Sequence, residues 1–410
     1  KKFIYLKRKR INMKNSLAII LTFIGLSLTV SASDLPETVL VTGQEQHVQG
    51  IAYDSAENCM YMSFTSRFVK TDMQGNILAS IDRIQGHLGA MTFNPETRKV
   101  YASLECKDDE IGAGIAKTLN VNTVSRADSR FFIAIIDVDR LEGIGMDPEG
   151  NEVLRTVCIK KAVEDYAFRS KSGDFEHRYG CSGIDGVTIG PAIGKPEAAR
   201  YGRRSAGKPA ADEKYLYVGY GIYGDTDRTD NDYQVIHRYS LKELEKYARP
   251  VIFGETHHDG PEKPEKEYFL RTGNTNYGIQ NFAYDEYTDC FFLAVYKGRK
   301  ADFPNYSLFA FKALQQPFKA ALTGGRDKKK VLQLSLVKPE EPYFINPSVD
   351  ETTGITGWRF RWGSTGLCPL GRGLWYISEN GKDRETGKEY CRARLYRWST
   401  KPGEAFVPAE

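Results

Sequence analysis

The sequence predicts an all-β fold, a five-bladed β-propeller whose N-terminal strand closes the last blade. One short phrase recurs five times, further strand-like runs follow each copy, and a helical period is sustained only around residues 241–248. Repetition on the scale of a few strands indicates repeated structural units. Units of four short antiparallel strands are typical of propeller blades.

The phrase is a polar residue or Gly, an apolar or small residue, one further residue, then usually Gly and an apolar run. Each copy is expected to be the inner strand of one blade. The copies are HVQGIAYD at 47–54, GHLGAMTFN at 86–94, GIDGVTIG at 183–190, GIQNFAYD at 278–285 and GSTGLCPL at 363–370.

Second and third strands follow each copy as short runs rich in Val, Ile, Tyr and Phe, bounded by turn residues. Second strands are expected at 58–64, 98–105, 214–221, 289–296 and 373–380, and third strands at 67–73, 131–138, 233–241, 306–314 and 393–399. Fourth strands are expected at 76–82, 152–160, 249–253 and 330–336 for blades one to four.

The fifth blade has no fourth strand of its own after Trp398, whereas a strand-like run at 37–43 precedes the first blade. The N-terminal strand is therefore expected to complete the last blade and to leave no open sheet edge. A β-sandwich is the alternative, but it does not explain five copies of one phrase. The blades are expected at about 44–84, 85–161, 179–255, 275–337 and 360–400 plus 36–43, in a single domain over 33–410.

Residues 1–32 are expected to be a leader and signal peptide. From Met13, a Lys, an apolar run at 17–30 and small residues at 31–33 follow in the order typical of secretory signals. A membrane anchor is the alternative, but the apolar run is short for a bilayer span. We therefore expect a secreted or periplasmic monomer with no membrane span after cleavage.

The charge and the cysteines exclude some functions. The chain has a net charge of +4, and residues 1–32 hold seven Lys or Arg and no acid, which leaves −3 for the rest. Nucleic-acid binding needs a basic surface, so no nucleic-acid partner is expected. The seven cysteines form no CxxC pair and give no zinc signature, although an oxidising compartment would permit a disulfide or two.

The propeller architecture predicts where a site would lie. Loops that enter the inner strands and leave the second strands meet on one face, around the mouth of the central channel. Aligning the five phrases places four polar residues and one Leu at equivalent positions, and a channel mouth tolerates such polar residues better than a packed core does. These residues are Gln49, Leu88, Asp185, Gln280 and Thr365.

Other polar and aromatic residues are expected at the same mouth. Three of only six His lie on the approaches to the inner strands, although each one alone could be a structural residue. The candidate catalytic residues are His47, His87, Glu105, Asp185 and Tyr220. The candidates for substrate binding are Gln49, His177, Tyr223, Tyr277, Gln280, Lys297, Arg359 and Trp362, with Trp358 as a further aromatic residue for stacking on sugar rings.

Long insertions also attach near this mouth, where they usually contact ligands. One of them carries Asp225, Asp227, Asp230 and Asp232. Its opening is similar to that of a calcium loop, but the Gly and the distal Glu of an EF-hand are missing. A solvated Asp-rich turn is therefore expected, with Ca²⁺ as the alternative, and no other cofactor or metal.

In architecture the chain resembles secreted five-bladed β-propeller carbohydrate-active proteins of the arabinanase and levansucrase type. The resemblance covers the mature chain as a blade pattern only. It implies a glycan substrate and, for hydrolysis, a carboxylate base on the first inner strand with a Glu acid from a middle blade. Here the first inner strand offers His47 and Gln49, so that motif is not matched, and Glu105 with Asp185 is the available carboxylate pair.

The chain is also similar to propeller polysaccharide lyases in its stock of His, Tyr and Arg. Elimination needs a base, a positive group to neutralise a uronate, and an acid for the leaving oxygen. His47 or His87, Arg359 or Lys297, and Tyr220 or Tyr223 could fill these roles.

Three functions therefore stay open. The first is a secreted glycan-active enzyme, a glycoside hydrolase or a polysaccharide lyase, with a neutral or acidic carbohydrate at the channel mouth. The others are a non-catalytic glycan or ligand binder using the same mouth and a protein-interaction scaffold.

Overall fold

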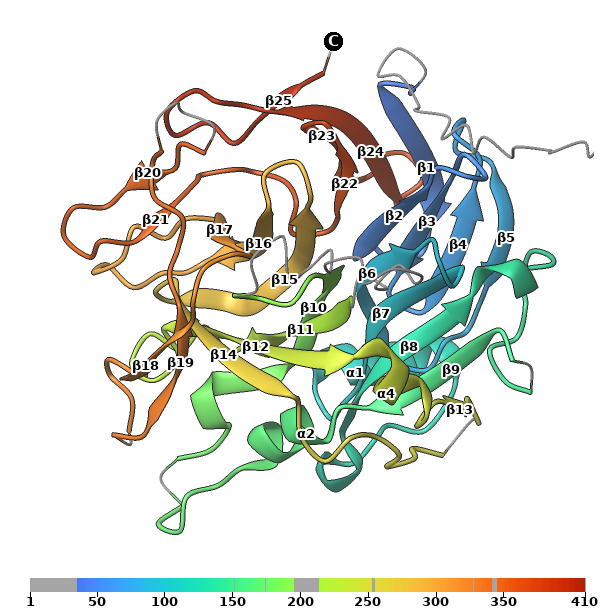
Figure 1. Ribbon diagram of the computed structural model, residues 1–410. Coiled ribbons are helices and arrows are strands. Elements are labelled where there is room, and N and C mark those ends of the chain that lie inside the picture. The colour runs from blue at the N-terminus through green and yellow to red at the C-terminus, as the bar shows by residue number, and fades with distance from the viewer. Residues whose placement is uncertain are drawn as a thin grey trace, which may run out of the picture.

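The computed structural model describes residues 35–150, 152–173, 175–194, 214–252, 255–326, 328–340 and 345–409. Within these residues, five mainly antiparallel sheets are arranged radially, as Figure 1 shows. The five-bladed β-propeller that the sequence predicts is thereby confirmed. The expected leader, residues 1–32, lies outside the described residues.

Blades one and two have the four strands expected of them. Strand β3 is buried at all of its residues, because the second strand of a blade is covered by neighbouring blades on both faces. Blade one consists of β2 (Gly50–Asp54), β3 (Cys59–Phe64), β4 (Arg67–Thr71) and β5 (Ile77–Ile81). Blade two consists of β6 (His87–Asn94), β7 (Lys99–Cys106), β8 (Arg130–Asp137) and β9 (Leu154–Cys158).

The outer strands of blades three and four differ from the expectation. The fourth strand of blade three is β14, and the range 249–253 was wrongly expected there, because β13 (Arg249–Pro250) pairs with β9 of blade two. Blade three consists of β10 (Cys181–Gly190), β11 (Tyr215–Ile222), β12 (Tyr233–Ser240) and β14 (Lys266–Arg271), extended by β19 (Lys330–Leu334) and β18 (Phe318–Ala321).

Blade four has three strands in the part of the chain that the structure describes. The expectation that 330–336 forms its fourth strand was wrong, because β19 pairs in parallel with β14 through Phe269 and Gln333. At its outer edge, β17 instead exchanges backbone hydrogen bonds with Trp358. The blade consists of β15 (Thr275–Asp285), β16 (Cys290–Lys297) and β17 (Leu308–Lys312).

Blade five is closed by the N-terminal strand, which confirms the expected closure. Thr38–Val41 of β1 pairs antiparallel with residues 391–394 of β24, so the two ends of the described chain share one sheet. The blade consists of β22 (Leu367–Gly371), β23 (Leu374–Lys382), β24 (Glu389–Trp398) and β1 (Thr38–Gln44), with β25 (Phe406–Pro408) on the far half of β24.

The described helices and the remaining strands lie in connections between strands, both within blades and between them (Figure 1). They are α1 (Glu110–Leu119), α2 (Lys160–Ala167), α4 (Leu241–Glu245), three short 3₁₀ turns at Arg126–Asp128, Val138–Arg140 and Arg178–Gly180, and the pair β20 (Ser348–Val349) and β21 (Thr356–Gly357).

The five inner strands pack against one another around the axis. Each of β2, β6, β10, β15 and β22 contacts the inner strands on both sides of it. A Cβ on Gly50 would lie 2.9 Å from the carbonyl oxygen of Gly89, which explains the Gly at the fourth place of the phrase. Blade four has Asn281 there, whose Nδ2 donates to the carbonyl oxygens of Gln49 and Ser364, each at 2.9 Å.

Backbone conformation explains the Gly at the first place of the phrase. In blades two to five this residue is Gly86, Gly183, Gly278 or Gly363, with φ between 66° and 136°. Such values favour Gly, because other residues rarely adopt them. His47 is not among the residues with positive φ, so the entry to blade one has a different backbone that accepts a side chain.

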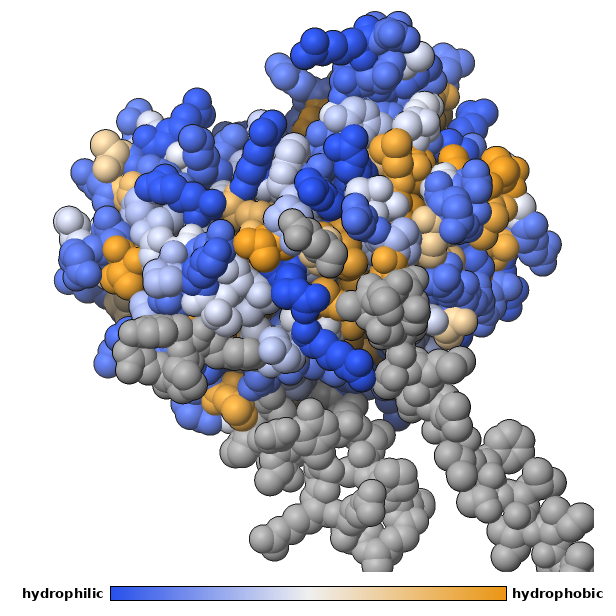
Figure 2. Space-filling view, turned by 90° about the horizontal axis from the view of Figure 1, so that it is seen from above, coloured by the Kyte–Doolittle hydropathy of each residue, from blue (hydrophilic) through white to orange (hydrophobic). Residues whose placement is uncertain are grey.

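All seven cysteines lie within the described residues and carry free thiols, so the disulfides that an oxidising compartment would permit are not formed. None of the described helices is long and apolar enough to cross a membrane. Figure 2 shows one side of the molecule, on which hydrophilic residues predominate and hydrophobic residues form small groups.

Closure by β1 can be tested with Val39 and Val41, which are 0% and 1% exposed, against Leu40, which is 41% exposed. The double substitution Val39→Ala and Val41→Ala should lower the free energy of unfolding by roughly 2–5 kcal/mol, because it leaves cavities between β1 and the core. Leu40→Ala should change it by less than about 0.5 kcal/mol. Urea denaturation measures both, and equal effects would contradict the closure.

Candidate functional site

Backbone bulges bring two of the equivalent polar residues together at the channel mouth. The pairing of β10 with β11 shifts register between Ile184 and Val187, and that of β15 with β16 shifts between Ile279 and Asn281. A bulge re-aims the side chain that it carries. The amide Nε2 of Gln280 donates to Oδ2 of Asp185 at 2.9 Å, so neighbouring blades meet there as expected.

A histidine and two carboxylates form the centre of the site. His87, Glu105 and Asp185 each place a nitrogen or oxygen within 4.8 Å of the others. Glu105 is 4% exposed, and its Oε1 accepts a hydrogen bond from the backbone N–H of Ile184 at 2.8 Å. A Cβ on Gly183 would lie 1.8 Å from this Oε1, so the Gly of the third phrase makes room for the carboxylate.

Lys107 supplies the positive charge of this cluster. Its Nζ lies 2.8 Å from Oε2 of Glu105 and 3.3 Å from Oδ2 of Asp109, and it donates to the carbonyl oxygen of Ser182 at 3.0 Å. The side chain is only 8% exposed. Sequence reasoning missed Lys107 because it begins the insertion after β7, although its place two residues after Glu105 was a usable signal.

Burial and mutual repulsion affect the pKa values of the two carboxyl groups. Burial raises the pKa of Asp185 well above its usual range, and the charge of Glu105 raises it further. Burial also raises the pKa of Glu105, but Lys107 and the N–H of Ile184 oppose that shift. The direct ion pair with Lys107 therefore favours the ionised form of Glu105, whereas Asp185, next to the charge of Glu105, is the carboxyl group whose protonated form is favoured.

The central histidine is neutral. Burial lowers the pKa of His87 to about 3, and the nearby charge of Lys107 adds to this shift. Its Nδ1 is buried and has no hydrogen-bond partner among the described residues. With so low a pKa, the imidazole stays neutral at neutral pH and can accept a hydrogen bond through its unprotonated ring nitrogen.

The same three residues offer nitrogen and oxygen donors to a divalent cation. Lys107 already places an ammonium group against Glu105, and its charge would repel a metal ion at this position. The arrangement therefore favours proton transfer over metal binding.

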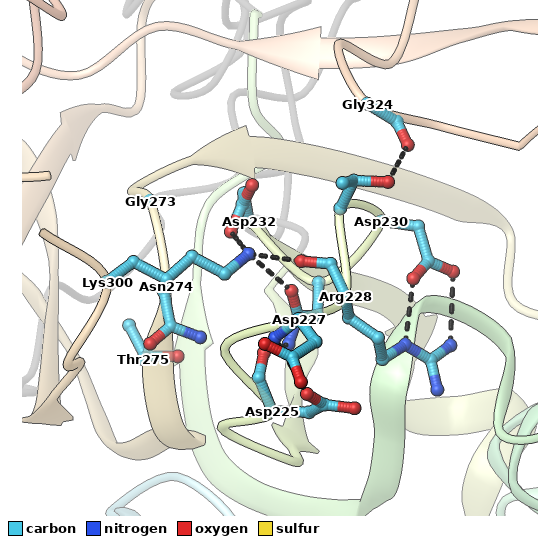
Figure 3. A network of polar contacts seen from close by, with 12 residues as sticks. Asp225, Asp227, Arg228, Asp230, Asp232, Gly273, Asn274, Thr275, Lys300 and Gly324 are labelled. Atoms are coloured by element: carbon cyan, nitrogen blue, oxygen red, sulfur yellow. Dashed lines mark hydrogen bonds and ion pairs between the residues drawn. The ribbon is translucent and has the colours of Figure 1, made fainter. Parts of the chain in front are cut away.

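The side chain of Lys300, from the loop after β16, reaches into the Asp-rich loop between β11 and β12 (Figure 3). The Nζ of Lys300 donates to the carbonyl oxygen of Arg228, to Oδ1 of Asn231 at 3.0 Å and to Oδ1 of Asp232 at 2.6 Å. Asp230 forms an ion pair with Arg228 at 2.8 Å. An ammonium group thus lies among oxygens of the kind that Ca²⁺ would take, and the loop is an ordered network joining blades three and four.

Blade one contributes His47 and Gln49. Their Nε2 atoms are 2.8 Å apart, so the Gln49 amide donates to the ring nitrogen of His47. Burial lowers the pKa of His47 and leaves its imidazole neutral. A protonated His47 would in turn lower the pKa of His87 through charge repulsion. At the other equivalent places, Leu88 is fully buried in the core, and Thr365 hydrogen-bonds to Ser378 at 2.6 Å.

Aromatic residues form the walls around this centre. On one side the ring of His177 lies 4.8 Å from Tyr166 and 5.1 Å from Tyr223, and the two Tyr hydroxyls are hydrogen-bonded. Burial raises the pKa of Tyr223. On the other side Tyr277 is 44% exposed and meets the ring of Tyr296 edge-on at 6.5 Å.

Two aromatic candidates are buried away from the mouth. Tyr220 is fully buried, and its hydroxyl donates to Oδ2 of Asp165 at 2.9 Å and lies 3.2 Å from Nε2 of His237. Successive side chains of a strand point to opposite faces, and Tyr220 faces helix α2. Trp358 is 0% exposed and lies 5.4 Å from the ring of Trp398, so it cannot stack on a sugar.

The remaining candidates do not join the central cluster. Arg359 donates to the carbonyl oxygen of Pro304 at 2.9 Å and lies over the ring of Tyr306. Trp362 packs against the core of blades four and five. Lys297 is exposed at the end of β16, where its backbone pairs with Thr275.

The protonation of Asp185 can be tested through stability. Because the native pKa is raised, the native state keeps a proton that the unfolded chain releases, and stability falls as pH rises above about 4. Asp185→Asn imitates the protonated form, so its stability advantage over the wild type should be absent near pH 4 and present at pH 8. Urea denaturation at both pH values measures this, and parallel pH dependence of the two proteins would contradict it.

The Asp-rich loop gives a second test. Lys300→Met leaves the oxygens of Asn231 and Asp232 without their donor and should cost about 1–3 kcal/mol of stability, whereas the exposed Lys319→Met should cost little. Addition of CaCl₂ should leave the Tm of the wild type unchanged in thermal denaturation. A rise in the wild-type Tm with Ca²⁺ would show that the loop binds the metal despite Lys300.

Comparison with known proteins leaves the site to be interpreted from its own geometry. No protein-family model matches the chain, and no curated protein is similar to it in sequence. Among solved structures, the chain is similar to the β-propeller domain of Myceliophteria thermophila Cps50 (Swd1), with 10% identity, coverage of 86% of this chain and 84% of that chain, and a TM-score of 0.31.

Proposed function

We propose that this protein is a glycan-active enzyme, a glycoside hydrolase with its site at the mouth of the propeller channel. The observation that carries the proposal is the pair Asp185 and Glu105, two buried carboxyl groups from neighbouring blades with oxygens within 4.8 Å of each other, and with Lys107 paired to Glu105. Hydrolysis of a glycosidic bond uses such a pair, one protonated and one ionised.

Each carboxyl group has a distinct role in this reaction. Asp185, whose pKa is raised by burial and by the charge of Glu105, would protonate the glycosidic oxygen of the leaving sugar. As that C–O bond breaks, the Glu105 carboxylate, stabilised by Lys107, would bond to the anomeric carbon and form a glycosyl ester. In the second step Asp185, now ionised, would take a proton from the water that releases the sugar from Glu105.

The separation of the two groups supports one stereochemical outcome. Their nearest donor atoms lie within 4.8 Å. Retaining glycosidases have carboxyl groups about 5–5.5 Å apart, whereas inverting enzymes need about 6.5–9.5 Å to admit a water molecule. The short separation therefore supports retention of configuration at the anomeric carbon.

The surroundings of the pair suit a sugar. Tyr277 presents an exposed ring beside Gln280, and aromatic faces with amide donors are the groups that hold sugar rings and their hydroxyls. Tyr223 and His177 form the opposite wall, and His47 with Gln49 adds two polar groups from blade one.

A polysaccharide lyase is less well supported. The residues proposed to neutralise a uronate, Arg359 and Lys297, do not contact the central cluster, and the candidate acid Tyr220 is committed to Asp165. A protein-interaction scaffold has no specific observation in its favour. Export to the periplasm or medium remains part of the proposal, on the strength of the leader-like residues 1–32.

Activity against a panel of neutral and uronate-containing polysaccharides tests the proposal. The wild type should release reducing ends from at least one polymer with retention of configuration, measured by NMR of the first product. Asp185→Asn and Glu105→Gln should each lower kcat by about 10²–10⁴-fold while Tm stays at or above the wild-type value for Asp185→Asn.

Three results would decide against the proposal. Release of unsaturated uronates in place of new reducing ends would favour a lyase. Binding of a polymer without cleavage, abolished by His47→Ala or Asp185→Asn, would favour a non-catalytic binder. Unchanged kcat in both carboxyl variants would remove Asp185 and Glu105 from the reaction.

A further inference from the structure

A cavity of about 980 Å³ lies between the top of blade two and the insertion that follows β7. Glu105 and Lys107 line it and also belong to the central cluster, so the cavity continues the candidate site outward. Ligand sites of small molecules have volumes of about 300–1,000 Å³, and this one is at the upper end.

The roof of the cavity is a well-formed helix. Asp109 caps α1 by accepting a hydrogen bond from the N–H of Gly112 at 2.8 Å, and Asn120 ends it in a left-handed conformation. Ile115 and Ala116, the two buried residues of α1, line the cavity, while Ile111, one turn earlier on the same side of the helix, is 44% exposed and does not line it. The insertion therefore supplies a fixed apolar surface opposite blade two.

The rest of the lining combines apolar and polar groups. Leu104, Phe132 and Val251 add apolar surface, and Asn122 and Thr123 add hydrogen-bonding groups. Sugar rings present apolar faces and hydroxyl edges, so they need this combination. Phe132 has an aromatic face, which packs against His257 at 5.0 Å.

The charges of the lining select between classes of glycan. Four carboxyl groups line the cavity, from Glu105, Asp128, Glu255 and Asp259, against the two cations Lys107 and Arg249. Arg249 is moreover paired with Asp259 at 2.8 Å. A uronate chain would meet an excess of negative charge here, and an uncharged chain would not.

We propose that this cavity binds the part of an uncharged oligosaccharide that extends from the bond cleaved at Asp185 and Glu105. The inference rests on the proposed function, and it specifies the substrate as a neutral polymer held over more than one sugar ring. The binding energy of these outer rings would lower the barrier at the carboxyl pair, so longer substrates would react faster.

The test fills the cavity without touching the carboxyl groups. Ile115→Trp places a large side chain inside, and Ile111→Trp makes the same change at an exposed position one turn earlier, outside the cavity lining. Both variants are compared with the wild type on a ladder of oligosaccharides prepared from the polymer that the wild type cleaves. Ala116→Met is a second, smaller filling substitution, and thermal denaturation confirms that each variant is folded.

For the wild type and Ile111→Trp, kcat/KM should rise with chain length. The kcat/KM of Ile115→Trp and of Ala116→Met should fall about tenfold or more on the longest oligosaccharides and change little on the shortest. If kcat/KM depended on chain length equally in all variants, the cavity would not bind the outer sugar rings, but the proposed hydrolase activity would be unaffected. Cleavage of uronate polymers only would overturn the neutral substrate, and a complete absence of cleavage would refute the proposed function itself.

Discussion

The close approach of five inner strands around one axis is the constraint on which the rest of this structure depends. Each inner strand contacts two others, and a Cβ on Gly186 would lie 2.3 Å from Ile279. Side chains larger than hydrogen are therefore excluded at the fourth place of most copies of the phrase. The exception, Asn281, uses its amide to hold the carbonyl oxygens of blades one and five. Steric crowding at the axis thus explains why the phrase repeats Gly at this place.

The same crowding creates the candidate site. Because the strands bulge as they enter the channel, Asp185 and Gln280 are turned toward it, and Gly183 leaves space for Glu105. Carboxyl groups brought so close in a buried place cannot both ionise without a counter-charge. Lys107 forms an ion pair with Glu105 and stabilises its charge, while that charge and burial raise the pKa of Asp185. The two carboxyl groups therefore differ in their surroundings before any ligand binds.

The sequence predicted the parts of the fold that the axis dictates. Inner strands, second strands and the closure by β1 follow from the Gly positions and from runs of Val, Ile, Tyr and Phe. Outer strands are under weaker constraint, because they pack on one side only, and β14 with its charged residues Lys266, Glu267 and Arg271 was missed. For the site, alignment of the phrases predicted Asp185 and Gln280. It could not predict that Tyr220 faces the opposite side of its strand toward Asp165, since a one-residue difference in register reverses the face.

Function in this fold depends on departures from the repeat. A ring of five equal blades would present five equivalent groups at its mouth, but here blade one has His47, blade two adds α1 with Lys107, and blade three supplies Asp185. These differences lie on consecutive blades, so the charged groups, the neutral His residues and the cavity under α1 gather on one side of the axis. Tyr277, from blade four, is 44% exposed, and its backbone carbonyl oxygen accepts a hydrogen bond from the Gln280 amide that also donates to Asp185. Under the proposed function, a ligand at this mouth would lie off the axis, with the bond to be cleaved at blades two and three and the rest of the ligand over blade two.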